Sequence, residues 1–236
     1  MPSLVVIGAQ WGDEGKGKVV DHLASLADVV VRFGGGPNAG HTLVVDGSKL
    51  IVRLVPSGIL WPRTECVLAQ GMVIDPDVLV GELEVLETRG HSVAGRLFVS
   101  HRAHLILPHH TLADGLRENL AAERAIGTTR RGIGPCYEDK IARRGLTVGD
   151  LRDLSHAERI VADTLDAWRP MFDRHHVELP AARTVVDRLA AAAARILPFV
   201  TDTASLVHDR ISAGKRVLLE GAQGTLLDID HGTYPF

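Results

Sequence analysis

Residues 8–18, GAQWGDEGKGK, have the spacing of a loop that binds phosphate groups, because Gly12 is followed after four residues by Gly17 and Lys18. In such a loop the backbone N–H groups and the positive end of the following helix converge on an anion. We therefore expect the loop to bind nucleotide phosphates, with Lys16 and Lys18 as positively charged partners. The alternative is an ordinary surface turn with solvated lysines.

This loop differs from that of common kinases and GTPases. Val19 stands where those proteins place a Ser or Thr that binds Mg²⁺, and the second predicted strand ends in VVVRFGG, without an aspartate. Asp13 lies inside the loop, where a carboxylate would repel a phosphate unless it had another task. The residues leave three roles open for Asp13: a metal ligand, a general base, or a cap of the helix N-terminus.

A second glycine-rich turn, GGGPNAGHT, spans residues 34–42. Its glycines permit close approach of the backbone to a ligand, while Asn38, His41 and Thr42 supply polar side chains. His41 is suited to donate a hydrogen bond to a phosphoryl oxygen. The alternative is a histidine with a structural hydrogen bond.

The segment 125–145, AIGTTRRGIGPCYEDKIARRG, interrupts a helical pattern and is predicted to be a long functional loop. Its hydroxyl and basic side chains suit a phosphomonoester, although a solvated charged loop would have the same composition. These residues are Thr128, Thr129, Arg130, Arg131, Lys140, Arg143 and Arg144. The pairs His109–His110 and His175–His176 are adjacent rather than four residues apart, so we expect no shared metal there and assign them no role.

Strand-like and helical segments alternate along the chain. The pattern predicts strands at 3–8, 28–33, from about Thr42, 49–55, 66–74, 96–100 and 216–221, and helices at 16–27, 76–89, from about Asp114, 155–176 and 181–197. Asp75 and Pro76 mark the start of one helix as its cap and first turn. The alternation predicts an α/β fold with a mostly parallel central sheet flanked by helices, whose ligands bind beyond the carboxyl ends of the strands. We also expect the last strand, RVLLEG, to expose apolar surface.

Composition narrows the class of protein. The 236 residues are 45% hydrophobic and 23% charged with a net charge of −3, which fits a globular protein and gives no bulk attraction to nucleic acid or to an anionic membrane. The two cysteines, Cys66 and Cys136, lack the spacing of a zinc site, and neither a leader nor a membrane-spanning run is expected. A cytoplasmic protein without an internal domain boundary is predicted.

Four motifs coincide in one order: QWGDEGKGK, GGPNAGHT, GTTRRGIGPCYEDK and LLEGAQGTLLDIDHGTYPF. Together they resemble the adenylosuccinate synthetase family, from residue 4 to the last residue. The resemblance implies that GTP phosphorylates the 6-oxygen of IMP and that the amino group of L-aspartate then displaces the phosphate, giving adenylosuccinate, GDP and phosphate. It also implies that residues 1–236 are the amino-terminal portion of a single domain, because members of the family continue further.

The resemblance assigns roles to particular residues. It implies that Asp13 takes the proton from N1 of IMP and binds Mg²⁺, with the Gly40 carbonyl as a second ligand. His41 becomes the acid that hydrogen-bonds the transferring phosphoryl group, and Lys16 and Gln223 join the catalytic set. The residues implied in nucleotide binding are Gly12, Asp13, Glu14, Gly15, Lys16, Gly17, Lys18, Asn38, Ala39, Gly40, His41, Thr42, Thr129, Arg143 and Gln223.

The resemblance further implies a homodimer in which Arg143 reaches the IMP site of the partner. Arg130 stands where many relatives carry Gly or Lys, and we assign it no contact. Two rival functions remain: a generic kinase or GTPase, against which Val19 and VVVRFGG count, and a nucleotide-binding but non-catalytic fragment. Release of phosphate from GTP that requires both IMP and L-aspartate would distinguish them.

Overall fold

The computed structural model describes residues 3–12, 14–38, 40–45, 48–122 and 127–234, with the backbone alone for 41–45 and 48–50. Its centre is a six-stranded parallel sheet in the order β1-β10-β2-β5-β7-β9. The strands are β1 (Ser3–Gly8), β10 (Val217–Gly224), β2 (Val29–Arg32), β5 (Glu65–Leu68), β7 (Leu97–Ser100) and β9 (Val200–Thr201). The predicted α/β class with a mostly parallel sheet is confirmed.

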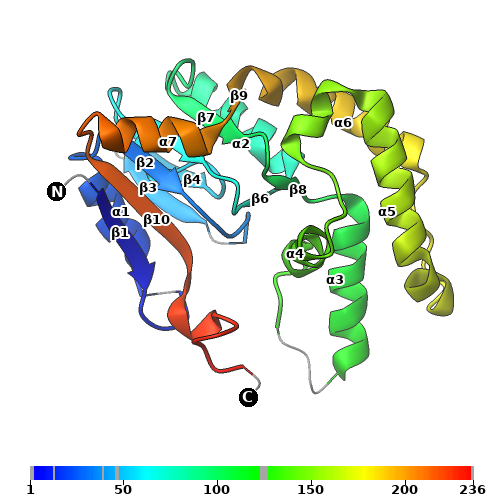
Figure 1. The fold of residues 1–236 in the computed structure, drawn as a ribbon. Coiled ribbons are helices and arrows are strands. Elements are labelled where there is room, and N and C mark those ends of the chain that lie inside the picture. Colours follow the sequence, from blue (N-terminus) through cyan, green and yellow to red (C-terminus); the bar gives the residue numbers. More distant parts are fainter. Residues whose placement is uncertain (1–2, 13, 39, 46–47, 123–126, 235–236) are drawn as a thin grey trace.

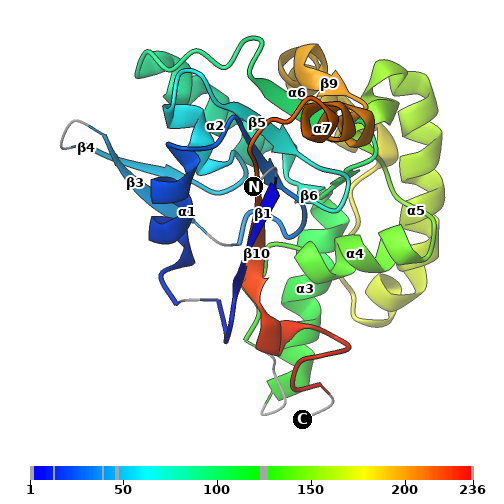
Figure 2. The same cartoon turned by 60° about the vertical axis from the view of Figure 1, so that its left-hand side comes forward.

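Two short ribbons accompany the sheet. β3 (His41–Val45) and β4 (Ser48–Val52) form an antiparallel pair, and β6 (Val73–Ile74) and β8 (His104–Leu105) form a parallel pair. The β3–β4 ribbon projects from the body of the molecule behind α1 (Lys16–Ala24) (Figure 2).

Helices cover both faces of the sheet, as the alternation of side chains along its strands requires. On β2, Val30 packs with Val20 of α1, whereas Val29 and Val31 belong to the cluster that includes Leu206 of α7 (Thr203–Ser212). The two helices therefore lie on opposite faces of the sheet, which Figure 2 shows nearly edge-on.

The remaining helices form a second layer beside β5 and β7, on the right in Figure 1. They are α2 (Pro76–Thr88), α3 (Pro108–Ala121), α4 (Ile133–Ile141), α5 (Leu154–Arg174) and α6 (Ala182–Ile196), with the 3₁₀ turns η3 (Val148–Arg152) and η4 (Leu197–Phe199). Two further 3₁₀ turns lie elsewhere: η1 (Ser57–Leu60) contacts α1 and β5, and η5 (Thr225–Leu227) follows β10. Asp75 caps α2 as predicted, accepting hydrogen bonds from the N–H groups of Asp77 and Val78 at 3.0 and 3.2 Å. In the described part of the chain, no helix is long and apolar enough to cross a membrane.

The segment 125–145 was expected to be one long loop, and this prediction was wrong where α4 forms. Gly132, with φ of 74°, precedes the helix, and Pro135 and Cys136 are buried in its first turns. The glycines and the proline concealed the helical pattern, because these residues more often mark turns. The preceding helix α3 also begins at Pro108, earlier than the expected start near Asp114.

The expectation that the last strand exposes apolar surface was also wrong. β10 lies between β1 and β2, so that Val217 and Leu218 are each only 2% exposed. The exposed apolar strand is instead β1, at the edge of the described sheet, where Leu4, Val5 and Ile7 are 42, 56 and 61% exposed. The order of strands in space, rather than their order in the chain, decided which one is covered.

A buried carboxylate joins three helices. Asp139 on α4 accepts hydrogen bonds from His110 of α3 at 2.9 Å, from Trp168 of α5 at 3.0 Å and from Arg144 at 2.5 Å, and His109 lies 3.4 Å away. Burial acts to raise the pKa of Asp139, but these hydrogen bonds outweigh it and hold the pKa below its ordinary value. Asp139 is therefore an ionised acceptor at the meeting point of the helices.

His109 and His110 converge on Asp139 although they are adjacent in sequence, and the possible ligand atoms of the three residues lie within 4.8 Å of one another. The Nδ1 atom of His110 accepts a hydrogen bond from the N–H group of Leu107 at 2.9 Å. Its Nε2 atom therefore carries the proton that Asp139 accepts. Hydrogen bonding explains this convergence, because a neutral His110 accepts from the N–H group of Leu107 and donates to Asp139.

We predict that this cluster makes the protein acid-sensitive. Burial lowers the pKa of His110 from 6.5 to about 4, so an unfolded chain takes up the proton at a higher pH than the folded one. Stability is then complete above about pH 7 and falls as the pH drops through 6.5 towards 4, by up to roughly 3 kcal/mol. Urea unfolding of the full-length protein at pH 7.5 and at about pH 5 measures this loss.

The matched variants are His110→Gln, which keeps a hydrogen-bond donor near Asp139 but does not titrate, and His208→Gln, which alters an exposed histidine on α7. The first is expected to flatten the dependence of stability on pH, and the second to leave it as in the wild type. An unchanged slope in His110→Gln would contradict this assignment.

Candidate nucleotide-binding site

Three loops meet at the carboxyl edge of the sheet. They follow β1 (residues 9–15), β2 (residues 33–40) and β10 (residues 225–227). Because β1, β10 and β2 are adjacent and parallel, their carboxyl ends lie at one edge (Figure 1), the position where open α/β sheets bind ligands.

The loop after β1 holds a negatively charged group on its backbone. The Oε1 atom of Glu14 accepts hydrogen bonds from the N–H groups of Gln10 and Gly12, at 2.6 and 3.0 Å. These backbone bonds, that from Gly12 foremost, lower the pKa of Glu14. Gly12 and Gly15 have φ of 111° and 84°, a conformation that other residues rarely adopt. The loop thus presents N–H groups that converge on an anion.

The two predicted lysine partners differ in their surroundings. Lys16, the first residue of α1, is buried, and its Nζ atom donates a hydrogen bond to the carbonyl of Ala222 on β10 at 3.0 Å. Lys18 and Val19 are exposed. Lys16 consequently places a positive charge between the loop and the last strand, where an anion bound to the loop would meet it.

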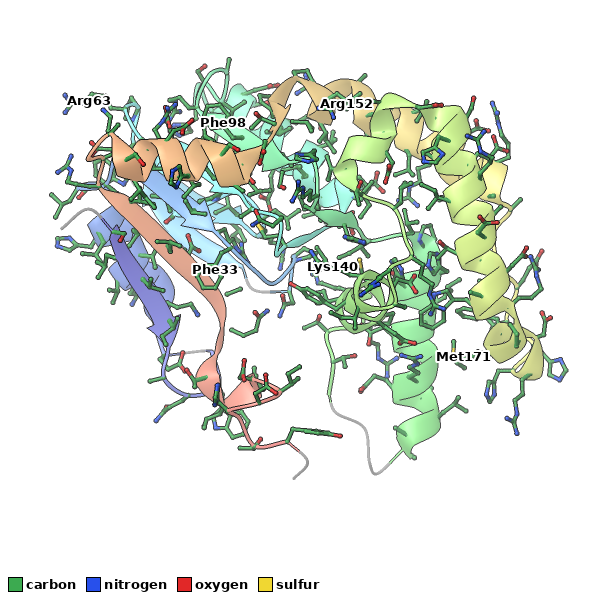
Figure 3. All side chains as sticks on the ribbon, in the orientation of Figure 1. Phe33, Arg63, Phe98, Lys140, Arg152 and Met171 are labelled. Atoms are coloured by element: carbon green, nitrogen blue, oxygen red, sulfur yellow. The ribbon has the colours of Figure 1, made fainter. Side chains whose placement is uncertain are left out.

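The loop after β2 packs against the end of β10. The Nε2 atom of Gln223 lies 3.4 Å from the Oδ1 atom of Asn38, which joins two residues predicted to bind the same ligand. Gly35 has φ of 79°, and a Cβ atom there would stand 2.4 Å from that of Ala222. The hydroxyl of Tyr137 on α4 accepts a hydrogen bond from the N–H group of Gly35 at 2.9 Å. Phe33 opens this loop beside β10 (Figure 3).

The end of β10 also closes on the loop after β1. The hydroxyl of Thr225 donates to the carbonyl of Gly8 at 2.7 Å, and the N–H group of Leu226 donates to the carbonyl of Gln10 at 3.0 Å. A Cβ atom on Gly224 would stand 2.0 Å from the Gln10 carbonyl oxygen and 2.5 Å from the Gly12 nitrogen. This close approach of two backbones requires a glycine at position 224.

The structure therefore brings together part of the predicted site. Gly12, Glu14, Lys16, Asn38 and Gln223 lie on the three loops or at their borders. Asp13 and Ala39 fall outside the described residues, as do the side chains of His41 and Thr42. The binding and catalytic roles predicted for all of the site residues remain predictions.

In the basic segment around α4, some of the predicted phosphate-binding residues make contacts within the protein and others are exposed. Lys140, on the side of α4 towards the sheet (Figure 3), donates to the carbonyl of Gln70, and Arg144 is bound to Asp139. Thr128 donates to Asp114 at 2.8 Å. These contacts are structural. Thr129, Arg130 and Arg143 are exposed, and among the described contacts none joins Thr129 or Arg143 to the three loops.

Sequence reasoning missed several residues that shape the site: Arg32, Glu82, Tyr137 and Asp139. Each stands at the end of a strand or within a helix, where a charged or hydroxyl side chain usually faces water, and Asp139 stands between two further charged residues, Glu138 and Lys140. Arg32 alone offered a signal, since it follows three consecutive valines in a predicted buried strand. Its partners became apparent only from the fold.

Fold and site together define an α/β protein with a parallel sheet, at whose carboxyl edge backbone N–H groups converge on the Glu14 carboxylate. The model of one family, described as adenylosuccinate synthetase, matches residues 5–236. The chain belongs to the adenylosuccinate synthetase family, and it corresponds to the amino-terminal part of such proteins.

Relatives with this family name cover the whole chain. The adenylosuccinate synthetase of Sorangium cellulosum is 59% identical and that of Wolinella succinogenes 49% identical, each over 100% of this chain and 56% of the relative. The chain thus spans little more than half the length of these relatives.

The similar solved structures include the following two. One, described as fully ligated adenylosuccinate synthetase from Plasmodium falciparum, is 35% identical with a TM-score of 0.87, over 98% of this chain and 54% of that one. The other is a cyanophage S-2L succinoaminodeoxyadenylate synthetase bound to dGMP and to dATP as an energy donor. It is 27% identical with a TM-score of 0.63, over 99% and 54% of the two chains.

We predict that Gly224→Ala disrupts the meeting of the loops. The added methyl group would clash with the backbone of Gln10 and Gly12, so the variant is expected to lose about 1–3 kcal/mol of stability and to bind nucleotide more weakly. Gly134→Ala on α4 is the matched control, because open space surrounds that position and alanine favours helix. Urea unfolding and titration with a fluorescent GTP analogue measure both effects. Normal nucleotide affinity in Gly224→Ala would contradict the prediction.

Proposed function

We propose that the full-length protein carrying this chain is a GTP-dependent ligase that joins L-aspartate to IMP through a 6-phosphoryl intermediate, giving adenylosuccinate, GDP and phosphate in purine biosynthesis. The observation that carries the proposal is the convergence of three loops at one sheet edge, with a carboxylate already held by the N–H groups of Gln10 and Gly12. Membership of the family supplies the identity of the substrates.

In the proposed mechanism the loop after β1 binds the phosphates of GTP with the residues from Gly12 to Lys18, and Thr42 contributes from β3. Asp13 takes the proton from N1 of IMP, which moves electron density to the 6-oxygen and makes it the nucleophile towards the γ-phosphorus. His41 and Lys16 stabilise the transferred phosphoryl group through a hydrogen bond and a positive charge. The attacking and leaving oxygens are thus positioned and neutralised by residues of one sheet edge.

IMP is proposed to contact Asn38, Thr129 and Gln223. The hydrogen bond between Gln223 and Asn38 supports this grouping, because it shows that their side chains reach the same point. Gln223 holds the base close to Asp13. Arg143 is proposed to reach the IMP of the partner subunit in a homodimer.

A bound Mg²⁺ is proposed to be held by Asp13 and the carbonyl of Gly40, and it would neutralise charge on the phosphates of GTP. The donor set fits this ion, because both ligands are hard oxygen atoms and Gly40, the last residue of the loop after β2, is exposed to solvent. Residues 1–236 are proposed to be one portion of a single domain. The buried free thiols of Cys66 and Cys136 support the cytoplasmic location that we propose.

The second candidate applies to this chain by itself. A chain that spans about half of its relatives would lack partners for the guanine base and for L-aspartate, and it would then bind nucleotide without turnover. Good orientation is worth about 7–11 kcal/mol in such reactions, and a partial site forfeits much of it.

The deciding experiment compares the full-length protein with residues 1–236 under IMP, GTP, Mg²⁺ and L-aspartate. We expect adenylosuccinate, followed by its absorbance, and phosphate release that requires all three substrates, from the full-length protein alone. Replacement of IMP by dGMP, and of GTP by dATP, tests the chemistry described for the phage relative. Phosphate release that does not depend on IMP and L-aspartate would indicate a simple GTPase and would contradict the proposal.

We predict that Arg143 acts across the dimer. Full-length Arg143→Leu and full-length Asp13→Ala are each expected to be inactive, yet a mixture should regain activity. Some heterodimers then combine an intact Asp13 site with an intact Arg143 from the other subunit. The measurement is adenylosuccinate formation after mixing, with subunit exchange verified by native mass spectrometry. Exchange without any recovery would show that Arg143 acts within its own subunit.

A further inference from the structure

Arg32 is a fully buried charged residue directly beneath the site. It ends β2, and its side chain is 0% exposed. One guanidinium nitrogen, Nη2, donates to the carbonyl of Gly36 at 3.1 Å, and the other, Nη1, donates to the carbonyl of Arg53. Gly36 precedes the β3–β4 ribbon and Arg53 follows it. The side chain of Arg32 therefore joins the two ends of the segment that contains the β3–β4 ribbon.

Glu82 on α2 holds the second of these ends from the opposite side. Its carboxylate accepts hydrogen bonds from three consecutive N–H groups, those of Arg53 at 2.5 Å, Leu54 at 3.1 and 3.2 Å, and Val55 at 2.9 Å. The carbonyl of Arg53 is thus bound to a buried cation and its N–H group to a largely buried anion. The backbone at this point has little freedom to shift.

Charge holds this arrangement together. Burial lowers the pKa of Arg32, and the nearby carboxylates of Glu220 and Glu82 oppose that shift. Glu220 lies opposite Arg32 in the register of β10 and β2. Burial raises the pKa of Glu82, while the three N–H groups and Arg32 lower it. Buried charges of this kind are costly unless their partners stay in place, so they favour one geometry of the backbone.

What this arrangement holds is the segment that carries Asn38, Gly40, His41 and Thr42. A surface ribbon alone would not need a buried arginine at its base, because backbone pairing and apolar contacts suffice for ribbons. Described contacts fix the segment at both ends: Gly35 is bound to Tyr137, Gly36 to Arg32, and Arg53 to Arg32 and Glu82, while Gln223 contacts Asn38 between them.

We propose that Arg32 and Glu82 are positioning residues for phosphoryl transfer: bound to the backbone of Gly36 and Arg53, they fix both ends of the segment that presents Gly40 and His41 to the transferred group. This inference rests on the function proposed above. Neither residue touches substrate. A displacement of about 1 Å at a catalytic group can cost 100-fold in rate, so small movements at these two ends are sufficient to matter.

The test uses Arg32→Lys and Glu82→Gln in the full-length protein. Lysine keeps the charge, but its compact ammonium replaces a fork that reaches two carbonyls at once. Glutamine keeps the shape but turns an NH₂ group towards backbone N–H groups. In each variant we expect kcat to fall about 10- to 100-fold, with less than about threefold change in the KM for L-aspartate. Because both variants release Arg53, the double variant is expected to lose much less than the product of the two effects.

Arg96→Lys is the matched control. The guanidinium of Arg96 likewise binds carbonyls, those of Ile59 at 3.1 Å, Trp61 at 2.9 Å and Thr64 at 3.2 Å, but at η1 and the start of β5 rather than at the carboxyl edge. It is expected to lower the melting temperature, by less than Arg32→Lys because Arg96 is only partly buried, while leaving kcat unchanged. An equal loss of kcat in Arg96→Lys would assign Arg32 a merely structural role.

Hydrogen exchange provides a readout that does not depend on activity. In Arg32→Lys and Glu82→Gln, peptides covering residues 36–55 are expected to exchange faster, whereas those from β5 and β7 keep the wild-type rate. If the wild type makes no adenylosuccinate, the proposed function fails but this measurement still tests the anchoring. Wild-type exchange in residues 36–55 of both folded variants would overturn the inference. So would wild-type kcat in both variants of an active enzyme.

Discussion

The insertion of β10 between β1 and β2 is the constraint on which the rest of the site depends. β10 is the last strand of the described chain, yet it lies inside the sheet and pairs with both of its neighbours along their length. Its carboxyl end brings Ala222, Gln223 and Gly224 between the two glycine-rich loops. The contacts of Lys16 with Ala222 and of Gln223 with Asn38 exist only because of this strand order. The amino-terminal loop is therefore completed by residues more than 200 positions further along the chain.

Local patterns in the sequence were sufficient for most elements near the amino terminus. β1, α1, β2 and α2 were predicted because β-branched runs, helical spacing, the Asp75 cap and Pro76 are all signals within a few neighbouring residues. The pairing of β10 has no such signal, since it depends on which strand edges remain available after the others have formed. For the same reason the exposed apolar strand was misassigned, and α4 was hidden by its glycines and Pro135.

The sequence predicted the type of site and several of its residues, but not the buried residues that hold its loops in place. Glycine spacing indicated the anion-binding loop, and the resemblance supplied Asn38 and Gln223, which the structure then brings together. Glu82 and Asp139 could not be recognised as supports, because a charged residue on a helix is usually solvated. Arg32 offered a signal in the three valines before it, but nothing in the sequence indicated its partners. Only the fold shows that each contacts several backbone or side-chain partners. The many surface ion pairs, such as Arg183 with Glu158, contribute little by comparison, since water and salt screen exposed charges.

The two buried charged clusters, Arg32 with Glu82 and Asp139 with its partners, hold different parts of the structure in place. Arg32 and Glu82 act on a backbone segment beside the sheet edge, whereas Asp139 anchors α4 from within. Just beyond the end of α4, Arg143 has a left-handed conformation with φ of 59°, at a position that glycine usually takes. The N–H group of Arg144 closes the turn on the carbonyl of Asp139 at 2.9 Å, and its side chain binds the Asp139 carboxylate. The strain at Arg143, of order 1 kcal/mol, is tolerated because Asp139 holds both sides of the turn. The turn fixes the backbone of Arg143 and leaves its side chain exposed, so that the planar guanidinium is accessible for the bidentate phosphate contact that its proposed role requires.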